Sequence, residues 1–234
     1  MEAGWVRQAT VVVTAVVLGL PGSGRTSVVT ALRAAGVDAR EIDAAGLTLP
    51  EGDAAEDLPC VVVTASARDG ISADLAGLWE AVAERYQPRV LLWTFSDVGR
   101  ADDDDMRAIA ERVLGEPSTA VALPLADDDD EFAGMLDLRD WTITDAAGQR
   151  PADAEHREAA AALRDELIDA VLTVVDDEAA LGQRMSGMEP GPARLRALVG
   201  QALRSGQFVP SMSVKATDPV IGIDVLADLL RSTD

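Results

Sequence analysis

The chain has 234 residues, of which 48% are hydrophobic, enough for one good-sized α/β domain or for a domain that carries a large insert. Its formal net charge is -21 and its basic residues are few and scattered, which argues against general nucleic-acid binding because proteins that track a phosphate backbone usually carry a basic stripe. One cysteine and one histidine exclude a disulfide framework and a histidine-rich metal centre within the chain.

The first half of the chain alternates between predicted strands and predicted helices. Apolar and β-branched runs predict strands at 11–18, 40–42, 60–65 and 89–95. Helical spacing of apolar residues predicts helices at 26–35, 72–86 and 106–114. This alternation is typical of an α/β fold, with a mostly parallel sheet and helices on both faces.

The second half has a different pattern. It predicts strands at 120–125, 135–139, 141–145 and 208–214, and helices at 153–176, 178–185, 192–204 and 223–231. The two strands at 135–145 are expected to form a small antiparallel pair. Two runs of aspartate, 102–105 and 127–130, are interpreted as solvated loops or helix starts rather than metal sites, because negative charge suits a helix N-terminus.

The N-terminal apolar run raises the question of a signal peptide. Its valine content favours a strand, Glu2 lies before it, and no small-residue cleavage site follows. It is also too short to span a bilayer as a helix. We therefore expect a cytoplasmic protein without a membrane association.

The turn between the first strand and the first helix matches the P-loop pattern, except that arginine stands at the lysine position. In that pattern, glycines let backbone N–H groups converge on phosphates, and the following helix directs its positive end at the same charge. Thr26 is placed to bind Mg²⁺, whereas the planar fork of Arg25 keeps the charge but is not equivalent to an ammonium. A strand-turn-helix that needs glycine only for the turn remains the alternative. The expected nucleotide-binding residues are Gly19, Pro21, Gly22, Ser23, Gly24, Arg25, Thr26 and Ser27.

Four stretches, in order along most of the chain, resemble the G domain of elongation factor G and its actinobacterial elongation-factor-G-like relatives, which are translational GTPases. They are VVLGLPGSGRTSVVTAL, PCVVVTASARDGISADLAGLWEAVAERYQPRVLLWTFSD, the acidic helix and loop at 153–209, and IGIDVLADLL. The resemblance implies GTP or GDP as ligand, with Mg²⁺ as cofactor when nucleotide binds. It also implies a P-loop core at 1–114, an α+β insert at 115–208, and the last strand and helix of the core at 209–234.

The base-reading motif departs from the family. Thr94, Phe95, Ser96 and Asp97 stand where the family has Asn-Lys-x-Asp, so only Asp97 is expected to contact the base. The final Ser-Ala motif falls near 213–216 and is blurred.

The switch regions also depart from the family. Asp43 begins the best remnant of Asp-x-x-Gly and is the second candidate metal ligand, with Thr26. Leu47 occupies the position of the catalytic histidine and cannot orient a water molecule. The stretch from Thr26 to Pro59 is too short for a full switch I, which would supply another Mg²⁺ ligand. No catalytic residue is therefore assigned, and efficient hydrolysis is not expected.

Two functions stay open from the sequence. The first is a GTP-binding, translational-GTPase-like G domain with weak or no hydrolysis. The alternative is a pseudo-GTPase that serves as an interaction module for an unidentified protein partner, without a nucleotide cycle. A small-molecule kinase ranks last, because no second catalytic carboxylate and no cluster of lid arginines stands out. The resemblance ends with the G domain, so translocation by this chain is not expected.

Overall fold

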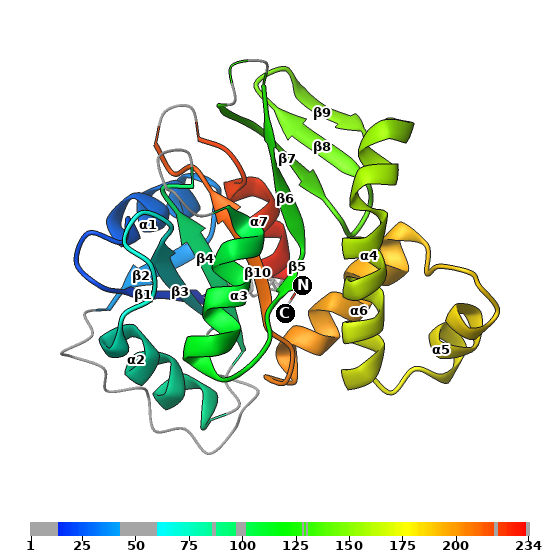
Figure 1. Cartoon of the computed structure of the whole chain (residues 1–234), viewed down its shortest axis with the longest axis horizontal. Helices are drawn as coiled ribbons and strands as arrows, with labels where there is room; N and C mark the ends of the chain where they lie inside the picture. Colours follow the sequence, from blue (N-terminus) through cyan, green and yellow to red (C-terminus); the bar gives the residue numbers. More distant parts are fainter. Residues whose placement is uncertain are drawn as a thin grey trace, which may run out of the picture.

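The computed structural model describes residues 14–42, 60–85, 88–96, 102–127, 129, 131–217 and 220–232. One part of the molecule is built on a six-stranded sheet with the order β2-β1-β3-β4-β10-β5, in which every pairing is parallel (Figure 1). Its strands are β1 (Thr14–Gly19), β2 (Asp38–Glu41), β3 (Cys60–Ser66), β4 (Arg89–Thr94), β5 (Thr119–Ala120) and β10 (Pro210–Val214).

Helices cover both faces of this sheet. Side chains of α1 (Arg25–Ala34) and α7 (Ile223–Arg231) pack in one core cluster, and those of α2 (Ala73–Ala83) and α3 (Asp103–Leu114) pack in another. The two clusters take alternate residues of the same strands, as the side-chain period of two requires. The predicted α/β fold of P-loop type, with helices on both faces, is confirmed.

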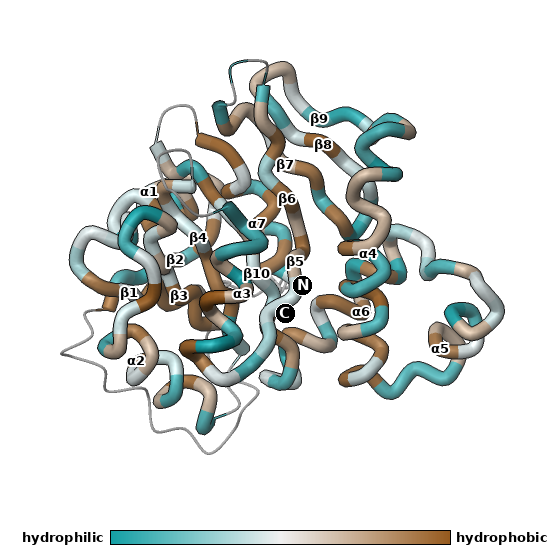
Figure 2. Tube along the Cα trace, viewed as in Figure 1, coloured by the Kyte–Doolittle hydropathy of each residue, from teal (hydrophilic) through white to brown (hydrophobic). Residues whose placement is uncertain are grey.

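The central strands are buried along their whole length. Every residue of β3, β4 and β10 is buried. Burial on both faces explains why β3 and β4 appear in the sequence as nearly continuous apolar runs, whereas β10 also buries Ser211 and Ser213. Figure 2 shows these apolar residues gathered along the strands between the helices. Trp79 and Trp93 are fully buried in the cluster beneath α2 and α3, which agrees with their assignment to the core.

Among the described residues, the segment 122–204 forms a four-stranded antiparallel sheet and three helices, beside the parallel sheet (Figure 1). The predicted antiparallel pair is present and is extended on both sides. These elements are β6 (Ala122–Ala126), β7 (Phe132–Asp137), β8 (Thr142–Asp145), β9 (Gly148–Pro151), α4 (Ala154–Val174), α5 (Glu178–Met185) and α6 (Pro192–Arg204).

The segment expected as the insert, 115–208, joins the parallel sheet directly at its start. β5 and β6 are separated only by Val121, whose N–H donates to the carbonyl of Ser211 in β10 at 3.1 Å. The carbonyl of Val121 accepts from the N–H of Leu138 at 3.0 Å, beyond the end of β7. One continuous extended segment therefore passes from the parallel sheet into the antiparallel sheet.

The first aspartate run starts a helix. The Asp102 carboxylate accepts from the N–H of Asp105 at 2.8 Å and caps α3, and the first turn carries three more aspartates. Because negative charge suits the helix N-terminus, α3 begins three residues before the apolar periodicity does. Among the described helices, none is both long and apolar enough to cross a bilayer.

Candidate functional site

The phosphate loop lies between β1 and α1, in a conformation that requires glycine. Gly22 and Gly24 have φ values of 84° and 79°, in the left-handed region that residues with a Cβ rarely adopt. Gly19 is required for a different reason, since a Cβ there would lie 2.1 Å from Oγ1 of Thr64. The three glycines of the motif are thus each explained by local geometry. Pro21 and Gly22 are exposed at the tip of the loop.

Hydroxyl groups of two neighbouring strands stabilise the loop by hydrogen bonds. The Thr64 hydroxyl of β3 donates to the carbonyl of Leu18 at 3.0 Å and lies 2.7 Å from the hydroxyl of buried Ser23. The Thr94 hydroxyl of β4 donates to the carbonyl of Ser23 at 2.8 Å. Because these contacts are made within the chain itself, the loop conformation does not depend on a ligand.

The loop lies where ligands bind in open α/β sheets. From β1 the chain turns to α1 on one face, and from the adjacent strand β3 it turns to α2 on the other face. The carboxyl ends of two such strands form a crevice at the topological switch point. The N-terminus of α1 opens into this crevice, with Gly24 as its N-cap residue.

Glu41, at the end of β2, contacts Arg25, which stands at the phosphate-binding lysine position of the motif, and Thr26, which the motif assigns to Mg²⁺. The guanidinium of Arg25 lies 3.3 Å from the Glu41 carboxylate, and its side chain is only 12% exposed. It also donates to the carbonyl of Ile42 at 3.2 Å. The Thr26 hydroxyl donates to the other Glu41 oxygen at 3.0 Å. Glu41 is a site residue that motif reasoning missed. The signal that could have found it is an acidic residue at the carboxyl end of a strand next to β1.

The oxygen atoms of Thr26 and Glu41 suit magnesium. Mg²⁺ prefers hard oxygen ligands and is commonly held by one or two carboxylates together with substrate phosphates. A hydroxyl and a carboxylate within hydrogen-bond distance, beside the phosphate loop, fit that requirement. Asp43, the other expected metal ligand, lies outside the described residues, as does Leu47.

The residues at the base-reading positions have taken other roles. Thr94 supports the phosphate loop, as described above, whereas Phe95 is partly exposed and has a left-handed backbone with φ 59°. The Ser96 hydroxyl lies 2.7 Å from that of Ser213. Asp97 lies outside the described residues.

The residues near the blurred Ser-Ala motif make contacts on two different sides of their segment. Ser213 is fully buried and donates to the Asp103 carboxylate of α3 at 2.6 Å, so the hydroxyl of Ser96 is the donor in their contact. Burial raises the pKa of Asp103 to about 6, against the opposing effect of this hydrogen bond. Val214 and Ala216 instead line a cavity on the other side of the segment.

That cavity adjoins the phosphate loop and has a volume of about 270 Å³. It lies where the carboxyl ends of β4 and β10 meet the first turn of α1. The guanidinium of Arg68 lies 5.0 Å from the centroid of the Phe95 ring at this place. The lining residues are Gly24, Ser27, Arg68, Thr94, Phe95, Val214, Lys215, Ala216 and Thr217.

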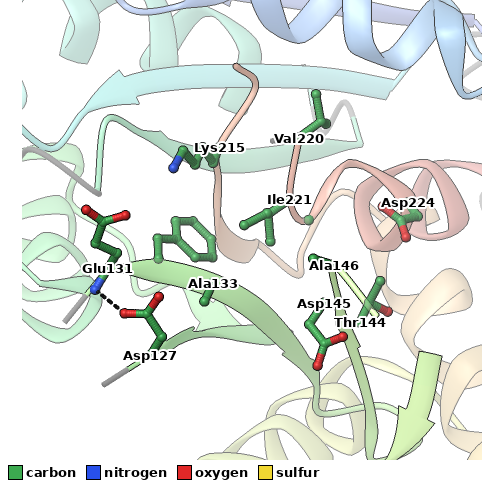
Figure 3. Close-up of a pocket in the computed structure, with 12 residues that line it drawn as sticks. Asp127, Glu131, Ala133, Thr144, Asp145, Ala146, Lys215, Val220, Ile221 and Asp224 are labelled. Atoms are coloured by element: carbon green, nitrogen blue, oxygen red, sulfur yellow. Dashed lines mark hydrogen bonds between the residues drawn. The ribbon is translucent and has the colours of Figure 1, made fainter. Parts of the chain in front are cut away.

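A second cavity, of about 360 Å³, lies between the antiparallel sheet and the segment that leads into α7 (Figure 3). Its apolar part comes from residues such as Phe132 and Ile221. Four carboxylates line it, with one ammonium, so it would repel a triphosphate. We therefore place the candidate phosphate site at the loop and not here. The charged lining residues are Asp127, Glu131, Asp145, Asp224 and Lys215.

The chain's lone cysteine and lone histidine lie away from the loop. Cys60 is buried at the start of β3, and burial raises the pKa of its thiol to about 12, so it is unreactive at neutral pH. His156 lies in the first turn of α4, with Nδ1 at 2.7 Å from the Asp153 carboxylate that caps the helix. Both are explained by structure alone.

Comparison by sequence finds no matching protein-family model and no matching curated protein. Comparison by structure finds a match to the crystal structure of ttk003000868 from Thermus thermophilus, with a TM-score of 0.69 and 20% sequence identity. The match covers 94% of this chain and 40% of the Thermus chain. At this identity the likeness shows a shared fold.

Proposed function

We propose that this chain is a G-domain-like protein that binds the phosphates of a nucleotide, GTP or GDP by the family resemblance, with weak or no hydrolysis. The single observation that carries the proposal is the preformed phosphate loop at the N-terminus of α1. Gly22 and Gly24 have left-handed backbones, and Ser23 between them is held by the hydroxyls of Thr64 and Thr94, so the N-terminus of α1 faces the crevice. The fold that the chain shares with the Thermus protein is compatible with this proposal.

In this proposal the backbone N–H groups of the loop and the end of α1 bind the phosphates. Arg25 supplies a positive charge, after it exchanges Glu41 for a phosphate oxygen. Thr26, with a carboxylate from Glu41 or Asp43, would hold Mg²⁺. The ion would supply positive charge that neutralises the phosphates. With leucine at position 47, no side chain is assigned to orient a hydrolytic water, so turnover is expected to be slow.

A second candidate function is a pseudo-GTPase that acts as an interaction module for a protein partner. The contacts of Glu41 favour it, because one carboxylate engages both the cation and the hydroxyl that phosphate and magnesium would need. In this alternative the Glu41 contacts stabilise the loop permanently, and the fold is kept for its surface.

Isothermal titration of the purified chain with GTP, GDP and ATP, with and without Mg²⁺, separates the two candidates. Arg25→Ala removes the charge at the loop, and Arg40→Ala is the matched control, because Arg40 is an exposed arginine on β2 that pairs only with nearby Asp38 in the described contacts. Micromolar binding that Arg25→Ala abolishes and Arg40→Ala preserves supports nucleotide binding. No heat with any nucleotide at about 100 µM protein, a concentration that still reveals weak sites, refutes it and leaves the interaction module.

A further inference from the structure

We propose that the base of the bound nucleotide stacks on the ring of Phe95, in the cavity of about 270 Å³ beside the phosphate loop. The chain would then take purine nucleotides with little preference for guanine over adenine. This inference rests on the proposed function, since it assumes that the phosphates occupy the loop.

The position of the cavity fits a base attached to phosphates on the loop. Gly24 and Ser27, from the start of α1, form one wall. A Cβ on Gly24 would lie 3.4 Å from Cβ of Thr94 and 3.5 Å from Cε2 of Phe95, so the aromatic ring packs directly against the loop. The volume lies just under the range of roughly 300–1,000 Å³ that is typical of pockets for whole small molecules, which suits a base with part of its ribose.

The chemistry of the lining does not distinguish guanine from adenine. Guanine presents a carbonyl where adenine presents an amino group, and both share the N7 acceptor. The described lining residues include no carboxylate and no amide side chain, the groups best suited to accept from the N–H groups of guanine, and the hydroxyls of Ser27 and Thr217 can donate or accept and so serve either purine. The Thr94 hydroxyl already donates to Ser23. Stacking therefore remains as the main source of affinity for the base, and every base has a π-face.

Arg68 would compete with the nucleotide base for contact with the Phe95 ring. Its guanidinium lies 5.0 Å from the ring centroid, its side chain is 53% exposed, and it pairs with Asp69 at 3.0 Å. An exposed cation–π contact contributes about 2- to 5-fold to an equilibrium, whereas stacking of a base on an aromatic side chain contributes about 5- to 150-fold. The base should therefore displace the guanidinium. Arg68→Ala is expected to leave nucleotide affinity unchanged or to raise it by no more than about fivefold.

The test measures dissociation constants for GTP, ATP and inorganic tripolyphosphate with the full chain and its Phe95 variants. We expect GTP and ATP to bind within about threefold of each other. Phe95→Ala should weaken both by about 5- to 150-fold and leave tripolyphosphate unchanged. Phe95→Trp should keep the nucleotide affinity, and Phe95→Leu should lose it, because leucine preserves apolar bulk without a π-face. Thermal unfolding of each variant shows that the fold is intact.

Three results overturn the inference. A preference for GTP over ATP of about 100-fold or more, removed by Asp97→Asn, would mean that hydrogen bonds read the base. Equal weakening of tripolyphosphate and nucleotides by Phe95→Leu would mean that the ring only supports the loop. In both cases the proposed function still stands. Absence of tripolyphosphate and nucleotide binding to the wild-type chain would refute the proposed function, and the inference with it.

Discussion

Neutralising Glu41 tests how the phosphate loop is used. Glu41→Gln keeps the shape of the side chain but breaks its ion pair with Arg25, whose N–O distance is 3.3 Å. The Arg25 side chain is 12% exposed and that of Glu41 is 33% exposed, so the pair is more sheltered than a surface pair but still screened by water. We assign it about 1 kcal/mol, at the upper end of the range for exposed pairs. In a binding constant this is roughly a fivefold change.

The assay is titration with GTP and with inorganic tripolyphosphate, in EDTA and in Mg²⁺. In EDTA the phosphates must displace Glu41 from Arg25, so Glu41→Gln should bind about fivefold tighter than the wild type. In Mg²⁺ the advantage should reverse, because the variant lacks the carboxylate beside the hydroxyl of Thr26. Asp38→Asn, on the same strand but paired with exposed Arg40, is the matched control and should have no effect. Identical affinities of Glu41→Gln and the wild type in EDTA would refute this account of the loop.

Three further predictions concern stability. Gly19→Ala should lower the free energy of unfolding by about 1–3 kcal/mol or more, measured by urea denaturation, because its Cβ would lie 2.1 Å from a hydroxyl oxygen of β3. Because the pKa of Asp103 is raised to about 6, the folded state binds its proton more tightly than the unfolded state, and this group adds stability as the pH falls from 7 towards 4. Asp103→Asn should therefore be more stable than the wild type at pH 8, with an advantage that shrinks towards pH 4; the exposed neighbour substitution Asp105→Asn should show no such trend. Arg139→Leu should cost about 3 kcal/mol, the lower end of the range for breaking a buried pair, because buried Asp137 loses the guanidinium at 2.7 Å and keeps the more distant Arg196 at 3.7 Å; Asp137→Leu in the same chain should recover part of that loss.

The elements that the sequence predicts well are those whose burial repeats along the chain. The helices at 192–204 and 223–231, with six buried residues each, have the predicted bounds, and the core strands differ from prediction by a few residues. β9 was not predicted, because all four of its residues are exposed and polar or small, so it has no apolar alternation. The antiparallel pairing with β8 is what places these residues in a strand.

The conformation of the phosphate loop is the part of the candidate site that the sequence can predict, because it is local. The glycines of the loop need no long-range information, since their conformation follows from the motif. The contact between Glu41 and Thr26 joins two elements through side chains, and no short pattern encodes it. The left-handed backbone of Phe95 cannot be predicted from the sequence either, because propensity would give an aromatic residue after a strand an extended conformation.

The continuous extended segment of β5 and β6, which joins the parallel sheet to the antiparallel sheet, determines which parts of this protein can be removed without loss of the fold. β5 and β10 are parallel neighbours, so everything between them serves as the crossover that returns the chain to the end of the sheet where both strands begin. α6 is the helix that directly precedes β10, and it carries six buried residues. It is therefore a packed part of the crossover between β5 and β10. A shortened chain would therefore tolerate loss of the β8–β9 hairpin or of α5 far better than removal of the whole segment 115–208. A shortened chain would still need a helix in the position of α6.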